Sequence, residues 1–145
     1  MLCELVLAAA MFLPAADGQP GVSPRSFQVI VNRSNPVSDL SRAEVSAIFM
    51  KRMRSWQDGA EIVAVDQPAR SALRDVFSRT IHEKSVAFVS RYWQRLIFAG
   101  RGIPPAVAAS DEEVIAFVAR NRGAIGYVSQ NATLSDDVKV LVVTK

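Results

Sequence analysis

Two short stretches combine residue types and spacing that suit the binding of a small anion. The stretch Arg70-Ser71 follows the turn Asp66-Gln67-Pro68 and begins an amphipathic segment, and Ser34-Asn35 comes directly after an apolar run. A helix start offers free backbone N–H groups and a partial positive charge, and ligands of open α/β sheets bind where strands end. The alternative for the serine at position 71 is that it only caps the helix. We predict a ligand-binding role for four residues, Ser34, Asn35, Arg70 and Ser71.

No arrangement of residues in the sequence is typical of catalysis or of metal binding. His82 is the only histidine; it lies in the polar stretch Thr80–Lys84 and is interpreted as a surface residue. Cys3 is the only cysteine, so the sequence has no cysteine-rich metal site. The acids Asp111–Glu113 suit a helix N-terminus, where carboxylates are stabilised. We therefore expect a protein that binds without catalysing a reaction and that needs no metal or cofactor.

A basic patch with an aromatic neighbour raises the question of nucleic acid. Lys51, Arg52 and Arg54 precede Trp56. The patch is either a nucleic-acid-binding face or a solvated helix end, where cations favour the C-terminus and the indole packs on the core. The formal charge of the chain is only +3, which is compatible with an anionic small ligand and too low to indicate nucleic acid. We expect no nucleic-acid partner.

The elements that must position these residues alternate between strands and helices. Apolar runs predict buried strands at residues 27–32, 62–65, 124–128 and 138–143. Periodic apolar residues, two of them behind capping boxes that begin at Ser41 and Ser110, predict helices at 41–50, 70–77, 85–98 and from 111 onward. This alternation predicts an α/β layer sandwich with an at least partly parallel sheet. The buried helix faces should include Val45, Ile48, Phe49, Leu73, Val76, Phe77, Val86, Val89, Trp93, Leu96, Ile97, Val114, Phe117 and Val118.

Two glycines near the C-terminus have different expected roles. Gly123 follows the last predicted helix, where a C-cap glycine belongs. Gly126 lies inside a predicted strand, which indicates a close backbone approach or a bulge.

The N-terminal residues are interpreted as a targeting segment. Leu5–Leu13 is an apolar run of signal-peptide length, and Pro14-Ala15-Ala16 supplies the small residues of a cleavage site. The alternative is a hydrophobic helix or strand of the domain itself. We predict a signal peptide at 1–16, a linker at 17–26 and one domain at 27–145. The mature chain should then be periplasmic, without a cysteine and without the ~18 apolar residues of a membrane span.

Four fragments, taken together, resemble a known family. They are IVNRSNPVSDLSRAEVSAIFMKRMRSWQDG, IVAVDQPARSALRDVF, FAGRGIPP and DEEVIAFVARNRGAIGYVS. Their order, and above all the run Gly-Ala-Ile-Gly-Tyr-Val at 123–128, resembles the phosphate-binding proteins of bacterial ABC transporters. The resemblance covers about Phe27 to Val143. It implies a periplasmic-binding-protein-like fold, phosphate as ligand, and an ABC permease as partner in full-length members.

The resemblance also has two departures. Family members have two lobes that close on phosphate, and this chain matches roughly the second lobe, so a single lobe with a mixed, mostly parallel sheet flanked by helices is implied. The family's phosphate loop has a Gly-Ser-Gly-Thr run after an arginine, and only Ser71 is kept here, with Leu73 in place of the threonine. The family arginine falls near Asp66 or Gln67, and Arg70 supplies a cation instead. The resulting prediction is an exported protein that binds phosphate or a similar oxyanion. The alternative is a ligand-free protein-interaction module of the cell envelope.

Overall fold

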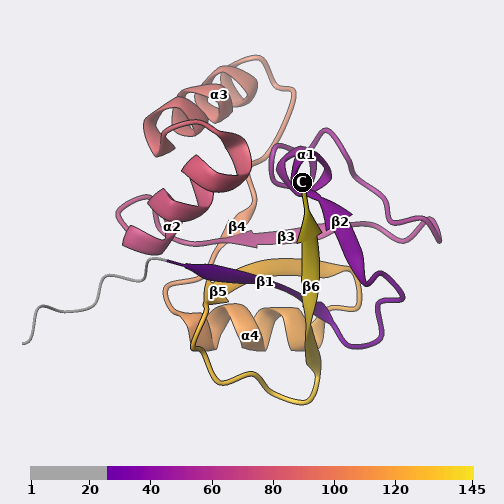
Figure 1. Ribbon diagram of the computed structural model, residues 1–145. Helices are drawn as coiled ribbons and strands as arrows, with labels where there is room; N and C mark the ends of the chain where they lie inside the picture. Colours follow the sequence, from indigo (N-terminus) through magenta and orange to yellow (C-terminus); the bar gives the residue numbers. More distant parts are fainter. Residues whose placement is uncertain (1–25) are drawn as a thin grey trace, which may run out of the picture.

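The computed structural model describes residues 26–145 as one α/β layer structure (Figure 1). The predicted signal peptide and all but the last residue of the predicted linker lie outside the described residues. The strands are β1 (Phe27–Asn32), β2 (Asp39–Ser41), β3 (Val63–Asp66), β4 (Ala106–Val107), β5 (Ala124–Ser129) and β6 (Val138–Thr144). The helices are α1 (Arg42–Phe49), α2 (Ala72–Phe77), the π-helix η1 (Ser78–His82), α3 (Val86–Phe98) and α4 (Asp111–Arg120). The predicted strands and helices are thus all present, and β2, β4 and η1 are additional.

The six strands form one mixed sheet in the order β2-β6-β1-β5-β3-β4, which confirms the predicted fold class. β1 pairs antiparallel with both β5 and β6, whereas the pairs β2–β6, β3–β4 and β3–β5 are parallel. Because β1 and β3 flank β5 in opposite directions, their C-terminal ends lie at opposite ends of the sheet. This geometry separates the two predicted anion sites, as described below.

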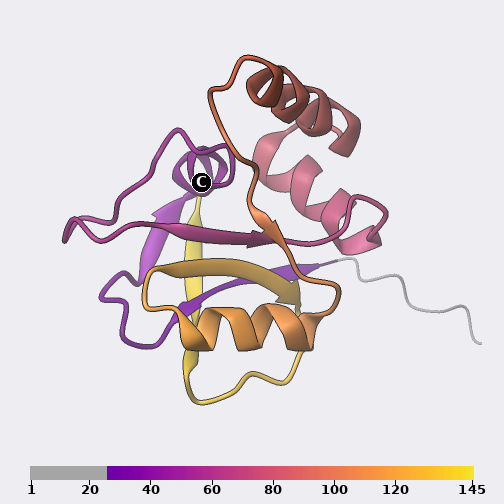
Figure 2. The same cartoon turned by 180° about the vertical axis from the view of Figure 1, so that it is seen from behind.

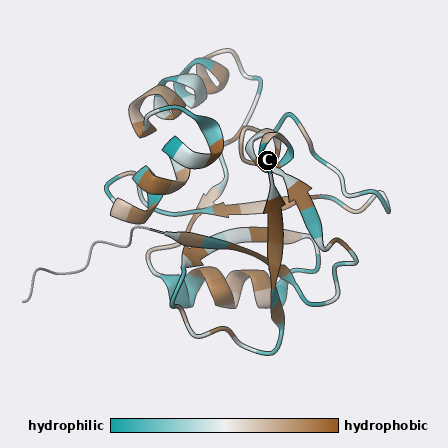
Figure 3. Cartoon of the chain, viewed as in Figure 1, coloured by the Kyte–Doolittle hydropathy of each residue, from teal (hydrophilic) through white to brown (hydrophobic). Residues whose placement is uncertain are grey.

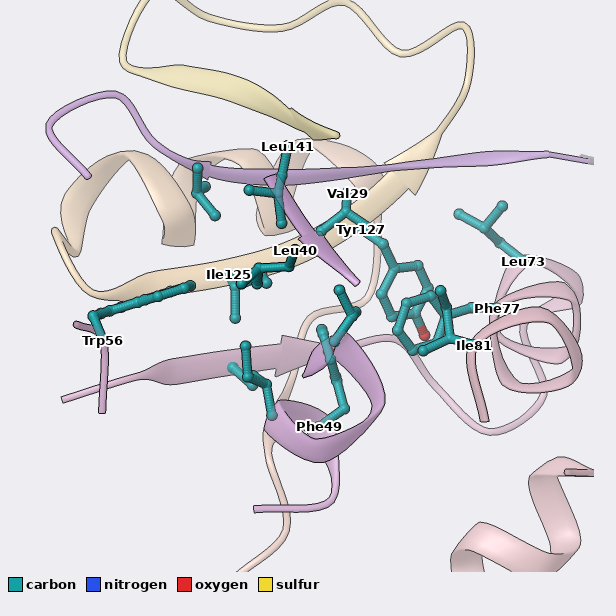
Figure 4. Close-up of a cluster of buried hydrophobic side chains, with 14 residues drawn as sticks. Val29, Leu40, Phe49, Trp56, Leu73, Phe77, Ile81, Ile125, Tyr127 and Leu141 are labelled. Atoms are coloured by element: carbon teal, nitrogen blue, oxygen red, sulfur yellow. The ribbon is translucent and has the colours of Figure 1, made fainter. Parts of the chain in front are cut away.

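Alternation along the strands divides the core into two layers. Val29 and Val31 of β1 belong to the cluster that α1 and α2 cover, and Ile30 between them belongs to the cluster under α4. Figure 2 shows α4 running along its face of the sheet, and Figure 3 shows hydrophobic residues concentrated in β6 and α4. The larger cluster, with Phe77 and Tyr127 side by side, is drawn in Figure 4. A strand that is buried on both faces has a near-continuous apolar sequence, as the run at 27–32 indicated.

Local signals in the sequence fix the helix starts. Ser41 and Glu44 form the complete capping box predicted for α1: the Ser41 hydroxyl accepts from the Glu44 N–H, and the Glu44 carboxylate accepts from the Ser41 N–H. At α4 the Ser110 hydroxyl also accepts from Glu113 N–H, but the Glu113 carboxylate accepts from Ala109 N–H instead.

The α3 helix packs less completely than its apolar pattern predicted. Val89 and Trp93 are buried, as expected, and they pack with Met50. Tyr92 and Leu96 are partly buried against this cluster, whereas Ile97, which was predicted to be buried, lies beyond it and is 51% exposed. Within residues 26–145 no helix has both the length and the apolar composition needed to cross a membrane.

Both glycines are explained by close packing. Gly123 is not a left-handed cap: α4 ends at Arg120 with Asn121 as its C-cap, and a Cβ at Gly123 would clash with the Glu61 carbonyl oxygen. At Gly126 a Cβ would lie 2.7 Å from a Val114 methyl carbon and 2.8 Å from one of Val65. The close approach predicted at Gly126 is therefore confirmed, since α4 and β3 leave no room for a side chain there.

Candidate functional site

The turn between β3 and α2 places Arg70 and Ser71 at the C-terminal end of a parallel strand pair. Ser71 is the N-cap of α2: its hydroxyl accepts from the Arg74 N–H at 3.3 Å and donates to the Gln67 side-chain oxygen at 3.1 Å. Capping satisfies one of the free donors of the first helical turn. The capping interpretation of Ser71 is therefore confirmed, and its hydroxyl is already engaged within the protein.

A buried ion pair lies directly behind this turn. Arg74 and Asp66 are 8% and 5% exposed, and the Arg74 Nη1 lies 3.3 Å from Asp66 Oδ2. The same Nη1 donates to the Gln67 carbonyl oxygen at 2.7 Å. Because an isolated buried charge is costly, each of these two groups needs the other.

Tyr127 and Gln67 complete the network around the ion pair. The Tyr127 hydroxyl donates to Asp66 Oδ1, which also accepts from the Gln67 N–H at 2.8 Å. The Gln67 side chain donates to Asp111 Oδ1 at 3.1 Å and to the Tyr127 carbonyl oxygen at 3.2 Å. The Tyr127 ring stacks on Phe77, with centroids 3.8 Å apart and planes 5° apart (Figure 4). The turn is therefore held from inside by side chains of β3, α2, β5 and α4.

Burial dominates the electrostatics of this network. Burial raises the pKa of the Asp66 carboxyl, while the Arg74 charge and the hydrogen bonds from Tyr127 and Gln67 oppose the rise. Burial and the nearby Asp66 carboxylate raise the pKa of the Tyr127 hydroxyl well above its usual value. The phenol therefore keeps its proton and remains a donor to Asp66.

Arg70 is the one predicted site residue whose charge faces water at this turn. Its side chain is exposed, and within residues 26–145 it forms no salt bridge or side-chain hydrogen bond. The backbone N–H groups of Ala72 and Leu73, in the first turn of α2, have no acceptor of their own in the helix. Arg70 and these N–H groups are the donors that an anion at this turn could use.

Ser34 and Asn35 lie at the other end of the sheet, so the four predicted residues do not form one site. Ser34 is exposed, and its N–H donates to Asn32 Oδ1 at 2.9 Å. Asn35 is buried; its Oδ1 accepts from the Val37 N–H, and its Nδ2 has no hydrogen-bond partner among residues 26–145. The cavity of about 100 Å³ beside Asn35 is also lined by the carboxylates of Glu44 and Asp58. These charges oppose an anion there.

His82 is half-buried rather than the surface residue that was expected. Its Nδ1 lies 2.8 Å from the Ser46 hydroxyl oxygen, and its ring contacts Phe77 edge-on. Burial, together with the charges of Arg74, Arg52 and Arg42, lowers the pKa of His82 to about 4. An imidazole of such low basicity is poorly suited to general-base catalysis near neutral pH, so this serine–histidine contact does not indicate an enzyme.

Comparison with known proteins places the chain in a family. A model described as a PBP superfamily domain matches residues 25–144. The chain belongs to the PBP superfamily. No curated protein matches the sequence.

Solved structures of PBP-type proteins share the fold. A protein from Clostridium perfringens, described as a phosphate ABC transporter substrate-binding protein with bound phosphate, is 23% identical with a TM-score of 0.64. An ABC-type phosphate transport receptor from Vibrio cholerae is 20% identical with a TM-score of 0.63, and PstS from Borrelia burgdorferi is 13% identical with a TM-score of 0.57. The matches cover 81% of this chain and 44%, 45% and 47% of those chains. The resemblance noted in the sequence is confirmed, and this PBP domain spans less than half of each of the three proteins.

The polar residues that organise the turn between β3 and α2 were not predicted from the sequence. The sequence indicates a turn at Asp66 and Gln67 and places the family arginine near them, and it predicts no polar role for Arg74 or Tyr127. A signal existed for Arg74: it precedes Phe77 by three residues and thus shares its inward face. No sequence signal identifies Tyr127 as a neighbour of Asp66, because the contact joins β5 to β3.

Proposed function

We propose that this chain, a domain of the PBP superfamily, binds phosphate or a similar small oxyanion without chemical reaction. The proposed site is the outer surface of the turn between β3 and α2. The observation that supports it is the different surroundings of two arginines near this turn. Arg74 is buried and neutralised by Asp66, whereas Arg70 is exposed and has no ion-pair partner in the described chain. Arg70 and the free N–H groups at the start of α2 would hold the anion.

Weak affinity follows from this geometry. The Ser71 hydroxyl is engaged by Gln67 and Arg74, so it would have to be shared or released. The remaining contacts face water, where attraction between charges is screened. We therefore expect a dissociation constant of ~1 mM, which corresponds to about 4 kcal/mol.

A second candidate function is a protein-interaction module of the cell envelope that kept the fold and lost the ligand. The specific support is that the buried guanidinium of Arg74 already forms an ion pair with Asp66, so few donors remain for an anion. Two adjacent apolar side chains at the end of α3, Ile97 and Phe98, are 51% and 91% exposed, and an apolar patch of this kind suits contact with another molecule. An ABC permease or another envelope protein would be the partner.

Export to the periplasm is part of the same proposal. It rests on the apolar run Leu5–Leu13 and the small residues after it. Mass spectrometry of the protein from its native envelope should find an N-terminus near Asp17. An intact Met1 on protein recovered from the cytoplasm would contradict export.

Phosphate binding can be tested by its effect on stability. Urea unfolding would be measured in chloride and in ~100 mM phosphate of matched ionic strength, with wild type and Arg70→Gln. A ligand present at ~100 times its dissociation constant stabilises the folded state by about 2.7 kcal/mol. Phosphate also stabilises proteins non-specifically, so the informative quantity is the difference between the two proteins. Arg33→Gln, which changes an exposed arginine at the far end of the sheet, is the matched control.

The expected result is that phosphate stabilises wild type and Arg33→Gln more than Arg70→Gln. Equal stabilisation of all three proteins would contradict an anion site at Arg70 and favour the interaction module.

A further inference from the structure

A cleft of about 290 Å³ lies between the end of α1, the start of β3 and the loop that follows α3. Three cationic side chains line it: Lys51 and Arg54 from the turn after α1, and Arg101 from the loop. Glu61 is the one acidic residue in its lining. The cleft borders the start of β3, whereas the turn with Arg70 follows the end of that strand. It is therefore a different place from the proposed phosphate site.

In the part of the chain that the structure describes, the three cationic side chains of the cleft form no ion pairs. Among residues 26–145, no salt bridge involves Lys51, Arg54 or Arg101. The Arg54 Nε donates to the Lys51 carbonyl oxygen at 3.2 Å, which holds the base of its guanidinium against the turn. Glu61 offsets one charge, so the cleft keeps a net positive charge of two. Unpaired cations around a concave surface attract anions.

Lys51 occupies a backbone position that normally favours glycine. Its N–H donates to the Ile48 carbonyl oxygen and the Arg52 N–H to that of Ala47, which is the Schellman ending of a helix, and its φ is 53°. The α3 helix ends in the same way, with hydrogen bonds from Gly100 and Arg101, but there the left-handed residue is glycine. Because a non-glycine residue in this conformation strains the backbone, the presence of lysine here indicates a function for its ammonium group.

The loop that supplies Arg101 is also fixed in place. The Arg101 N–H donates to the Leu96 carbonyl oxygen at 2.9 Å, which ties the start of the loop to the end of α3. Ile103 then projects into water with 76% of its surface exposed, although it lines the cleft. An exposed apolar residue beside three cations suits a ligand that has both an anionic and an apolar part.

We propose that this cleft binds a small organic anion whose phosphate or carboxylate group contacts Lys51, Arg54 and Arg101. The apolar part of the ligand lies against Ile103 and the inner wall formed by Met53 and Ile62. A volume of about 290 Å³ is at the lower end of ligand pockets, which suits a molecule with one ring or a short chain.

The test uses NMR titration of isotope-labelled protein at low salt with phenyl phosphate, inorganic phosphate and benzyl alcohol. Phenyl phosphate should shift the amide signals of Arg101, Gly102 and Ile103 saturably. Because the ring adds apolar contact, it should bind there at least ~3-fold more tightly than inorganic phosphate. Benzyl alcohol, which lacks the charge, should bind more weakly than phenyl phosphate.

Matched variants identify the groups responsible. Lys51→Gly removes the ammonium group while suiting the left-handed backbone, so the fold should be retained. Lys51→Gly and Arg101→Gln should each weaken phenyl phosphate binding by ~3-fold or more, since each removes one ionic contact. Arg91→Gln, on the outer side of α3, should leave it unchanged.

Three results would overturn the proposal. They are the absence of saturable shifts in the cleft up to about 50 mM phenyl phosphate, equal affinity for inorganic phosphate and phenyl phosphate, and equal affinity in all variants. Shifts confined to Arg70–Leu73 would support the phosphate site and count against the cleft. Shifts confined to the cleft would support the cleft and count against the phosphate site.

Discussion

The turn before α2 and the cleft beside α1 use positive charge in opposite ways. At the turn, Arg74 is 8% exposed and is paired with Asp66 inside a network of hydrogen bonds. At the cleft, Arg54 and Arg101 are exposed and have no ion-pair partner in the described chain. A buried charge must be paired, so it serves the fold, whereas a solvated charge remains available for a ligand. The two regions should therefore respond differently to mutation.

Loss of the buried arginine should have the largest effect. Arg74→Met leaves the Asp66 carboxylate buried without its cation and should lower the free energy of unfolding by about 3–5 kcal/mol. Arg79→Met removes the exposed arginine that pairs with Asp75 on the same helical segment, and it should cost less than ~1 kcal/mol. Urea unfolding measures both values.

A double variant tests whether the unpaired Asp66 carboxylate causes this loss of stability. In Asp66→Asn/Arg74→Met neither charge is left unpaired, so part of the lost stability should return. Equal stabilities for Arg74→Met and Arg79→Met would show that the network at the turn is not structural.

Low pH should decrease the stability of the folded protein because of His82. The pKa of His82 is about 4 in the folded protein and near 6.5 when unfolded. Below pH 6.5 the unfolded chain takes up a proton that the folded protein refuses, so stability falls as the pH drops toward 4. The loss due to His82 at pH 4.5 should be about 2–3 kcal/mol.

The measurement is urea unfolding at pH 7 and pH 4.5, with wild type and His82→Asn. The comparison isolates His82 from carboxyl groups such as Asp66, whose raised pKa acts in the opposite direction. The same pH dependence in the variant would exclude His82 as its source.

A change in the cleft should instead stabilise the protein. Lys51→Gly relieves a left-handed residue at the end of α1 and should raise the free energy of unfolding by about 1 kcal/mol. Gly100→Lys, at the equivalent position of α3, should lower it by a similar amount. Thermal unfolding of the two variants gives the comparison. A loss of stability in Lys51→Gly would mean that the lysine supports the fold rather than a ligand.

The smallest effect on stability is expected for Arg70. Arg70→Gln changes an exposed side chain without a partner and should shift the free energy of unfolding by less than ~0.5 kcal/mol. Chemical unfolding in chloride, without phosphate, is the appropriate measurement. A loss similar to that of Arg74→Met would place Arg70 in the structural network instead.

Much of the fold could be predicted because its signals are local. The apolar runs of β1, β5 and β6, the capping box at Ser41 and the crowded glycine at position 126 each depend on neighbouring residues or on simple burial. The short strands β2 and β4 were missed, since two or three residues contain no periodicity. Ile97 was misassigned because an apolar helix face gives no indication of how much of it the protein covers.

The candidate site was predictable only in part. The helix start and the capping role of Ser71 follow from residue types near one another in sequence. The separation of Ser34 from Ser71 depends on strand direction, and the Asp66–Tyr127 contact spans 61 residues. Neither is encoded in a local pattern, so the sequence could not reveal that the charge of Arg74 is used within the fold.

Residue-specific NMR during a titration with inorganic phosphate tests the central claim most directly. The account predicts saturable shifts of the Arg70, Ala72 and Leu73 amides with a dissociation constant of ~1 mM, and much smaller shifts in Arg70→Gln. The Asp66–Arg74 network should remain intact, so the signals of Tyr127 should stay in place. No saturable shifts at residues 70–73 up to tens of mM, with the fold intact, would contradict phosphate binding at this turn.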